Sequence, residues 1–177
     1  MTHHENADTA ILLLHEIYGI NQHMLDACEA YRALGYSVHC PNLFALSRRK
    51  RAGETAGENA PAGAEPYSYA ERDVAYANFM AGGGFSLAAS VAEFAGRLRS
   101  SHRRVFLVGY SVGATVAWLA AGREVCDGVV GHYGTRIRDH VAVRPGCPVL
   151  LIMAAEDGAF PAARAPARFR DAPDGAV

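Results

Sequence analysis

The chain has 177 residues, of which 50% are hydrophobic and 20% are charged, and its formal net charge is −1. These values predict one globular domain spanning residues 1–177, and they disfavour nucleic acid or a membrane as a partner. The four cysteines lack zinc-site spacing and the N-terminus lacks a secretory pattern. We therefore expect a cytoplasmic protein with reduced thiols, no metal and no cofactor.

Short apolar runs without polar alternation recur along the chain. They predict strands covered on both faces, as in a parallel sheet, at 10–16, 35–44, 104–111, 127–134 and 147–158. Apolar residues at helical spacing lie between them, at 21–35, 85–99 and 114–122. This alternation predicts an α/β fold with a mostly parallel sheet and helices on both faces.

The segment 47–66 differs from the rest of the chain. It is rich in Ala, Gly, Glu and Arg and has almost nothing apolar to bury, so we predict a flexible surface loop. We interpret its basic run, "RRKR", as solvated rather than as a contact for an acidic partner.

The stretch "GYSVG" places Ser111 in a G-x-S-x-G motif between a predicted strand and a predicted helix. This context predicts a nucleophile elbow, a sharp turn in which glycines leave room and the serine hydroxyl rises above the sheet. The N–H group of Val112, at the start of the helix, would then hold an oxyanion. The alternative interpretation is an ordinary strand–helix turn with a capping serine.

An acid is expected on a later strand, because this fold runs in the order Ser, then Asp or Glu, then His. Asp157 lies just beyond the apolar run of "LLIMAAEDGAFP", and Glu156 is the weaker candidate. The alternative for Asp157 is a turn residue before Gly158.

Five segments together carry a family pattern: "LLLHEIYGIN", "YRALGYSVHCPNLFA", "VFLVGYSVGATVAWLAA", "VVGHYGT" and "PVLLIMAAEDGAFP". Through them the chain resembles the dienelactone hydrolase family of α/β-hydrolases, from about Ala10 to its end. The combination of H-E-x-x-G, G-Y-S-x-G and the later Y-G is more specific than any one motif. The resemblance implies a hydrolase acting on a small-molecule ester or lactone.

The resemblance also implies roles for individual residues. Ser111 matches the nucleophile, Asp157 the acid that orients a histidine, and Glu16 a carboxylate beside the resting nucleophile. Ile17 matches the residue whose backbone N–H completes the oxyanion hole with that of Val112.

Two further residues are matched less directly. Arg72, in "YAERDVAYANF", falls where the family carries an arginine that binds a substrate carboxylate, and a guanidinium suits that task. The alternative is a solvated charge on a helix surface. Tyr133 either lines the pocket or simply packs beside it.

The sequence departs from the family at the nucleophile and at the base. Prototype members use Cys where this chain has Ser111, so general ester or lactone hydrolysis is the safer prediction, and a serine hydroxyl needs a general base. The family's histidine after the acid is absent. His132 and His15, near strand ends, are the alternative bases, unless both are simply held by their neighbours.

The chain resembles the central part of the family fold, without its N-terminal strand pair and its last strand. We expect the exposed sheet edge to be covered by a homodimer or a partner chain, or else the domain to be marginally stable. Without the histidine, a catalytically impaired pseudo-hydrolase or a fragment of a hydrolase is the alternative function.

Overall fold

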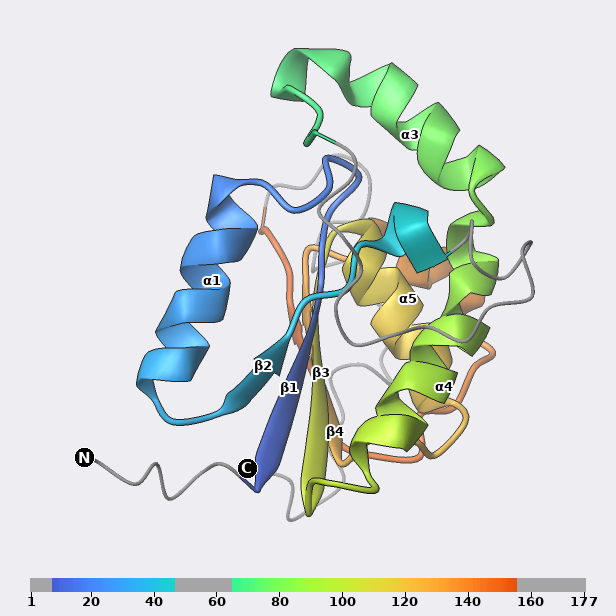
Figure 1. The fold of residues 1–177 in the computed structure, drawn as a ribbon. Coiled ribbons are helices and arrows are strands. Elements are labelled where there is room, and N and C mark those ends of the chain that lie inside the picture. Colours follow the sequence, from blue (N-terminus) through green and yellow to red (C-terminus); the bar gives the residue numbers. More distant parts are fainter. Residues whose placement is uncertain (1–7, 47–64, 156–177) are drawn as a thin grey trace.

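A computed structural model describes residues 8–46 and 65–155 of the chain (Figure 1). Its strands are β1 (Thr9–Leu14), β2 (Ser37–His39), β3 (Arg104–Tyr110), β4 (Gly128–His132) and β5 (Val149–Ile152). Its α-helices are α1 (Gln22–Ala33), α3 (Arg72–Ala81), α4 (Ala88–Leu98) and α5 (Val112–Ala121). Three 3-10 helices, η1 (Tyr69–Glu71), η2 (Gly84–Leu87) and η3 (Thr135–His140), are also described, and residues 43–46 are helical. The predicted loop at 47–66 lies outside the described residues, apart from its last two positions.

The five described strands form one parallel sheet in the order β2-β1-β3-β4-β5. The chain leaves β1 toward β2 on one side and returns to β3 on the other, which makes β1 and β3 the topological switch point. In open α/β sheets, ligands bind outside the carboxyl ends of the strands at that point. Helix α3 lies across this end of the sheet, at the top of Figure 1.

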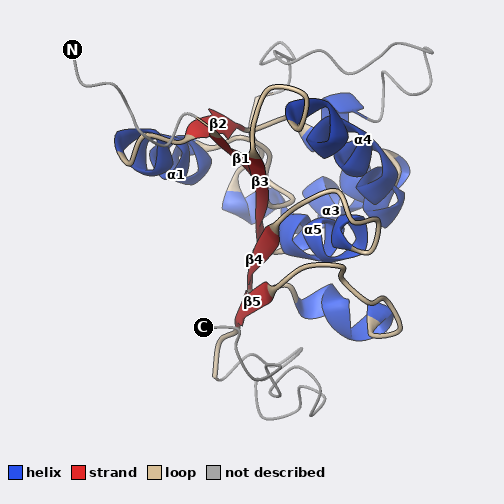
Figure 2. Cartoon of the chain, turned by 90° about the horizontal axis from the view of Figure 1, so that it is seen from below, coloured by secondary structure: helices blue, strands red, loops and turns tan. Residues whose placement is uncertain are grey.

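Helices cover both faces of the sheet, with α1 on one side and α4 and α5 on the other (Figure 2). Leu12 and Leu14 of β1 pack in the core on the α4 and α5 side, whereas Ile11 and Leu13 pack with Met24 of α1. Both faces of the strand are therefore buried, which explains its continuous apolar sequence. The predicted α/β architecture, a parallel sheet with helices on both faces, is confirmed.

Strand β5 is less covered than the central strands. Leu150 is 58% exposed and Ile152 is 44% exposed, whereas β1 is buried from Ala10 to its end.

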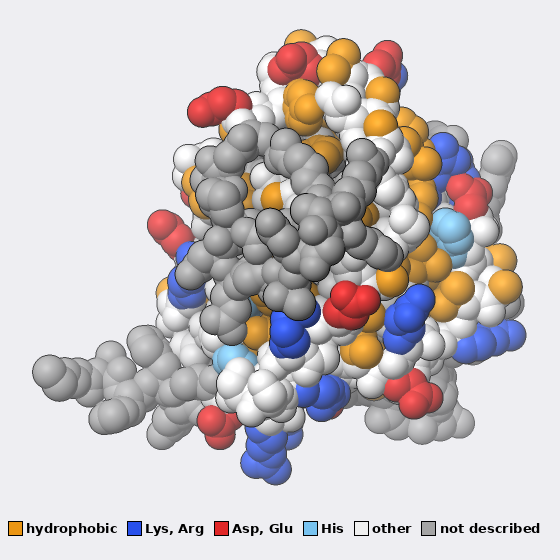
Figure 3. All heavy atoms as spheres, turned by 45° about the vertical axis from the view of Figure 1, so that its right-hand side comes forward, with side chains coloured by type: hydrophobic (Ala, Val, Ile, Leu, Met, Phe, Trp, Pro, Cys, Tyr) orange, Lys and Arg blue, Asp and Glu red, His pale blue; other side chains and the backbone are white. Residues whose placement is uncertain are grey.

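Charged side chains of both signs are interspersed over the surface seen in Figure 3. Among the described helices, none combines the length and the apolar character that crossing a membrane requires.

Helix α5 begins in direct backbone contact with the end of β1. A Cβ atom on Gly113 would clash with the carbonyl oxygens of Leu14 and His15, and one on Gly109 would clash with the backbone of Gly113 and Ala114. Backbone atoms cannot swing aside as a flexible side chain can. Both glycines of the G-x-S-x-G motif are therefore required by the close approach of strand, turn and helix.

We expect Gly113→Ala to lower the free energy of unfolding by about 2–4 kcal/mol, because its methyl group must push α5 away from β1. The matched control is Gly96→Ala on α4, where a Cβ would meet nothing within 4 Å. That change should raise stability by about 0.5–1 kcal/mol, since alanine is the better helix former. Urea unfolding of both variants checks this, and equal midpoints for Gly113→Ala and wild type would refute the proposed clash.

Candidate active site

Ser111 occupies the turn between β3 and α5 in a conformation that is rare for a residue with a side chain. Its backbone angles are φ 53° and ψ −116°. The N–H group of Ser111 donates to the carbonyl oxygen of His132 at 2.9 Å, which fastens the turn to the end of β4. Such strain persists only where the surroundings enforce it, and it concentrates at functional sites.

Helix α5 presents its N-terminus beside Ser111. The first N–H groups of an α-helix have no partner within the helix, and they carry a partial positive charge. Within the described residues, the N–H of Val112 has no hydrogen-bond acceptor, and neither does the N–H of Ile17. Ile17 follows β1, the neighbour of β3, so strand order brings these two residues together.

The turn after β1 is fixed by His15, which is completely buried. Its Nε2 atom accepts a hydrogen bond from the N–H of Leu43 at 2.8 Å, and its Nδ1–H donates to the carbonyl oxygen of Glu16. Burial lowers the pKa of His15 to about 4, so the ring is neutral near pH 7. Both ring nitrogens are engaged with backbone groups rather than with Ser111.

Glu16 is buried at the same strand end. Its Oε1 atom accepts a hydrogen bond from the hydroxyl of Tyr133 at 2.8 Å. Tyr133 follows β4 with a positive φ of 42°, and burial together with this bond raises the pKa of its hydroxyl. The bond therefore ties the end of β1 to the end of β4 across β3.

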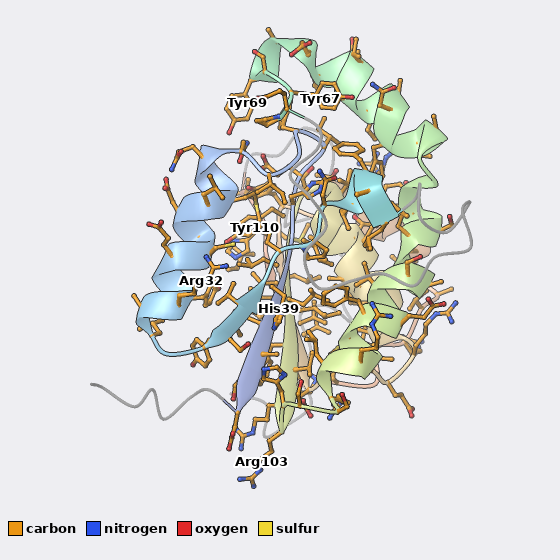
Figure 4. All side chains as sticks on the ribbon, viewed as in Figure 1. Arg32, His39, Tyr67, Tyr69, Arg103 and Tyr110 are labelled. Atoms are coloured by element: carbon orange, nitrogen blue, oxygen red, sulfur yellow. The ribbon has the colours of Figure 1, made fainter. Side chains whose placement is uncertain are left out.

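His132 lies one residue before Tyr133 and is half-buried. Its ring stacks on Tyr110, with centroids 4.6 Å apart and planes 11° apart, and His23 of α1 meets the same tyrosine edge-on. Figure 4 shows Tyr110 between α1 and the sheet. Burial, and to a smaller extent His23, lowers the pKa of His132, while burial raises that of Tyr110 to about 12.

A cavity of about 280 Å³ opens at the carboxyl ends of the strands, where it brings Ser111, Val112, Ile17 and Arg72 together. Its other lining residues are Asp73, Tyr76, Thr115, Thr135 and Arg136. The Arg72 side chain is 72% exposed and pairs with Asp73 at 3.1 Å.

Arg136 is a pocket residue that the sequence analysis did not find. Its Nη2 atom donates to the hydroxyl of Tyr76 at 3.1 Å, and its Nη1 atom pairs with Asp139 at the same distance. Its position in the sequence, shortly after β4, could have indicated this role, because loops that follow the carboxyl ends of strands line the site in this architecture.

The structure does not describe the two predicted acidic site residues. Asp157 and Glu156 lie outside the described residues, so their predicted roles stay predictions. Within residues 8–46 and 65–155, no side chain hydrogen-bonds to the Ser111 hydroxyl. The same part of the chain holds no group of three or more His, Cys, Asp or Glu side chains placed for a metal ion.

Sequence comparisons match the chain to known proteins over most of its length. The model of the dienelactone hydrolase family matches residues 1–171. The uncharacterized protein YczH of Bacillus subtilis (strain 168) is 34% identical over 141 residues, which are 80% of this chain and 61% of that protein. Carboxymethylenebutenolidase of Pseudomonas putida is 29% identical over 160 residues, which are 86% of this chain and 62% of that enzyme. The chain thus spans about three fifths of the length of both curated relatives.

Structure comparison supports the same fold. A candidate dienelactone hydrolase from Klebsiella pneumoniae subsp. pneumoniae MGH 78578 superposes with a TM-score of 0.64 at 20% sequence identity. The match covers 94% of this chain and 70% of that protein.

The buried His15 should make stability depend on pH. As the pH falls below the unfolded value of about 6.5, the unfolded chain takes up a proton that the folded His15 refuses until about pH 4. Stability is therefore lost on acidification, by about 2–3 kcal/mol between pH 7 and 4.5. Urea unfolding at the two pH values should show a smaller loss for His15→Gln, from a lower starting stability. His102→Gln, the control, should lose as much as wild type, and an equal loss in His15→Gln would contradict the assignment.

Proposed function

The chain belongs to the dienelactone hydrolase family, and on that premise we propose that it hydrolyses carboxylic esters or lactones with Ser111 as the nucleophile. One observation carries the proposal. The strained Ser111 shares a cavity of about 280 Å³ with Val112 and Ile17, whose N–H groups have no acceptor within the described residues. A nucleophile beside two unpaired donors is the arrangement that acyl transfer requires.

In this mechanism the Ser111 oxygen attacks the substrate carbonyl carbon while a base accepts the hydroxyl proton. The carbonyl oxygen becomes an oxyanion, which accepts hydrogen bonds from the N–H groups of Val112 and Ile17. Collapse expels the alcohol and leaves an acyl group on Ser111, and water then releases the acid. Because both donors are backbone groups held by β1 and α5, little reorganisation is needed when the charge develops.

Two histidines near the strand ends are candidates for the base. His15 is poorly suited, because backbone groups engage both of its ring nitrogens. His132 is better suited: its lowered pKa keeps it neutral near pH 7, and its carbonyl oxygen already holds the Ser111 turn. Its ring must leave Tyr110 to reach Ser111. Asp157 keeps its proposed role as the acid that orients the base.

The arginines of the pocket favour a substrate that carries a carboxylate. Arg72 and Arg136 line the same cavity as Ser111, from α3 and η3 respectively. A guanidinium binds a carboxylate through two parallel hydrogen bonds, and this would orient the reacting carbonyl over Ser111. Arg72 pairs with Asp73 and Arg136 pairs with Asp139, and both ion pairs are exposed to solvent.

A second candidate is a catalytically impaired relative that keeps the pocket. It is favoured by the finding that, within the described part of the chain, no side chain hydrogen-bonds to the Ser111 hydroxyl. Without a base, the oxyanion donors and substrate binding still leave a residual ~10³–10⁴-fold acceleration over water.

A fluorophosphonate probe separates the two candidates. We expect intact-mass analysis to show one adduct on wild type and on Ser86→Ala, an exposed-serine control, and none on Ser111→Ala. That pattern requires an activated Ser111, since an ordinary serine hydroxyl is too weak a nucleophile. Loss of labelling in His132→Ala but not in His15→Ala would then identify the base. A folded wild-type chain that takes no adduct would instead support the impaired relative.

Arg72→Ala should selectively weaken the binding of anionic substrates. We expect KM to rise about tenfold for a carboxylate-bearing lactone and to stay unchanged for its methyl ester, because only the former gains the guanidinium contact. Arg103→Ala is the control, since Arg103 lies at the opposite end of the sheet (Figure 4). Equal changes of KM for both substrates would argue that Arg72 is only a surface charge.

A further inference from the structure

Two cysteines meet at the end of the sheet opposite the candidate site. Cys126 precedes β4 and Cys147 precedes β5, and these neighbouring parallel strands pair with Val129 opposite Val149. Both thiols therefore lie at the amino ends of their strands. Their Sγ atoms are 3.6 Å apart.

We propose that Cys126 and Cys147 form a reversible disulfide site, which closes by exchange with a low-molecular-weight disulfide such as oxidised glutathione. A disulfide has a sulfur–sulfur distance of about 2.05 Å, so closure requires an approach of roughly 1.5 Å, within the reach of side-chain rotation. A backbone hydrogen bond already joins the starts of β4 and β5 beside the two cysteines. The N–H of Val129 in β4 donates to the carbonyl oxygen of Pro148, the residue after Cys147, at 3.0 Å.

The two thiols differ in a way that suits a two-step exchange. Cys147 is only partly buried, whereas Cys126 is 5% exposed. The two thiols are within hydrogen-bond distance of each other, and either can be the donor. This contact lowers the pKa of Cys147, although burial and the Asp127 carboxylate oppose that shift, and it raises the pKa of Cys126. Cys147 is therefore the thiol that reacts first, and Cys126 is the thiol that resolves the intermediate.

The exchange balances without any further reagent. The Cys147 thiolate attacks one sulfur of the low-molecular-weight disulfide, forming a mixed disulfide and releasing one thiolate. Cys126 then attacks the Cys147 sulfur, its proton passes to the departing thiolate, and the second small thiol is released. Two protein thiols are oxidised to one disulfide, and the reagent's disulfide is reduced to two thiols.

The disulfide would cross-link the two ends of a segment that contributes lining residues to the pocket. The chain between the two cysteines contains β4, Tyr133, Thr135 and Arg136, and it leads to the partly exposed edge strand β5. A cross-link between its ends restricts the unfolded chain and so stabilises the folded one. Because the thiols lie at the far end of the strands, the geometry around Ser111 is left unchanged.

Cys28 and Cys40 form a second thiol pair, which must be removed before the proposed pair can be tested alone. The thiol of Cys40 lies against that of Cys28 and lowers the pKa of Cys28 to about 7, so this second pair can also react. In the 177-residue chain, Cys28→Ser with Cys40→Ser leaves only the proposed pair. Cys28→Ser, Cys40→Ser and Cys147→Ser together leave Cys126 alone and form the matched control.

After treatment with oxidised glutathione, non-reducing peptide mapping of the first variant should show the Cys126 and Cys147 peptides joined. Its melting temperature should rise by roughly 5–10 °C and fall back on reduction, whereas the control should show neither change. Glutathione on Cys147 without a cross-link, or a cross-link that leaves the melting temperature unchanged, would overturn the proposal. Neither readout requires catalysis, so the result is independent of whether Ser111 is a working nucleophile.

Discussion

The contact between the first turn of α5 and the end of β1 is the constraint on which the candidate site depends. It is a backbone-to-backbone contact, since Gly113 faces the carbonyl oxygens of Leu14 and His15. At this distance no side chain fits between helix and strand, and the turn that joins β3 to α5 must be sharp. Ser111 therefore carries the strained conformation, and the starts of α5 and of the turn after β1 line one cavity.

Hydrogen bonds across the sheet hold this arrangement in place. The neutral, buried ring of His15 joins the turn after β1 to Leu43, and the bond from Tyr133 to Glu16 joins β1 to β4. The Ser111 turn is itself bonded to the end of β4. The ends of three adjacent strands are thus fixed to one another, which is the rigid support that oriented oxyanion donors need.

The two ends of the sheet have different chemistry. The carboxyl ends hold Ser111 and the arginines of the cavity, while the amino ends of β4 and β5 hold the Cys126–Cys147 pair. A covalent link at the amino ends would act on the stability of the β4–β5 segment and leave the reacting groups unchanged. The segment matters to the site because it carries Arg136, which lies in η3 between the two strands and lines the cavity.

The sequence by itself determined the strands, the main helices, the glycine-flanked turn at Ser111 and the family, because burial and turn geometry leave local patterns in the chain. Only the tertiary structure decided which distant groups meet. His15 binds Leu43, 28 positions away, and Tyr133 binds Glu16, 117 positions away. These contacts follow from the strand order β2-β1-β3-β4-β5, which apolar runs do not encode, since a buried strand has the same pattern at any central place in a sheet.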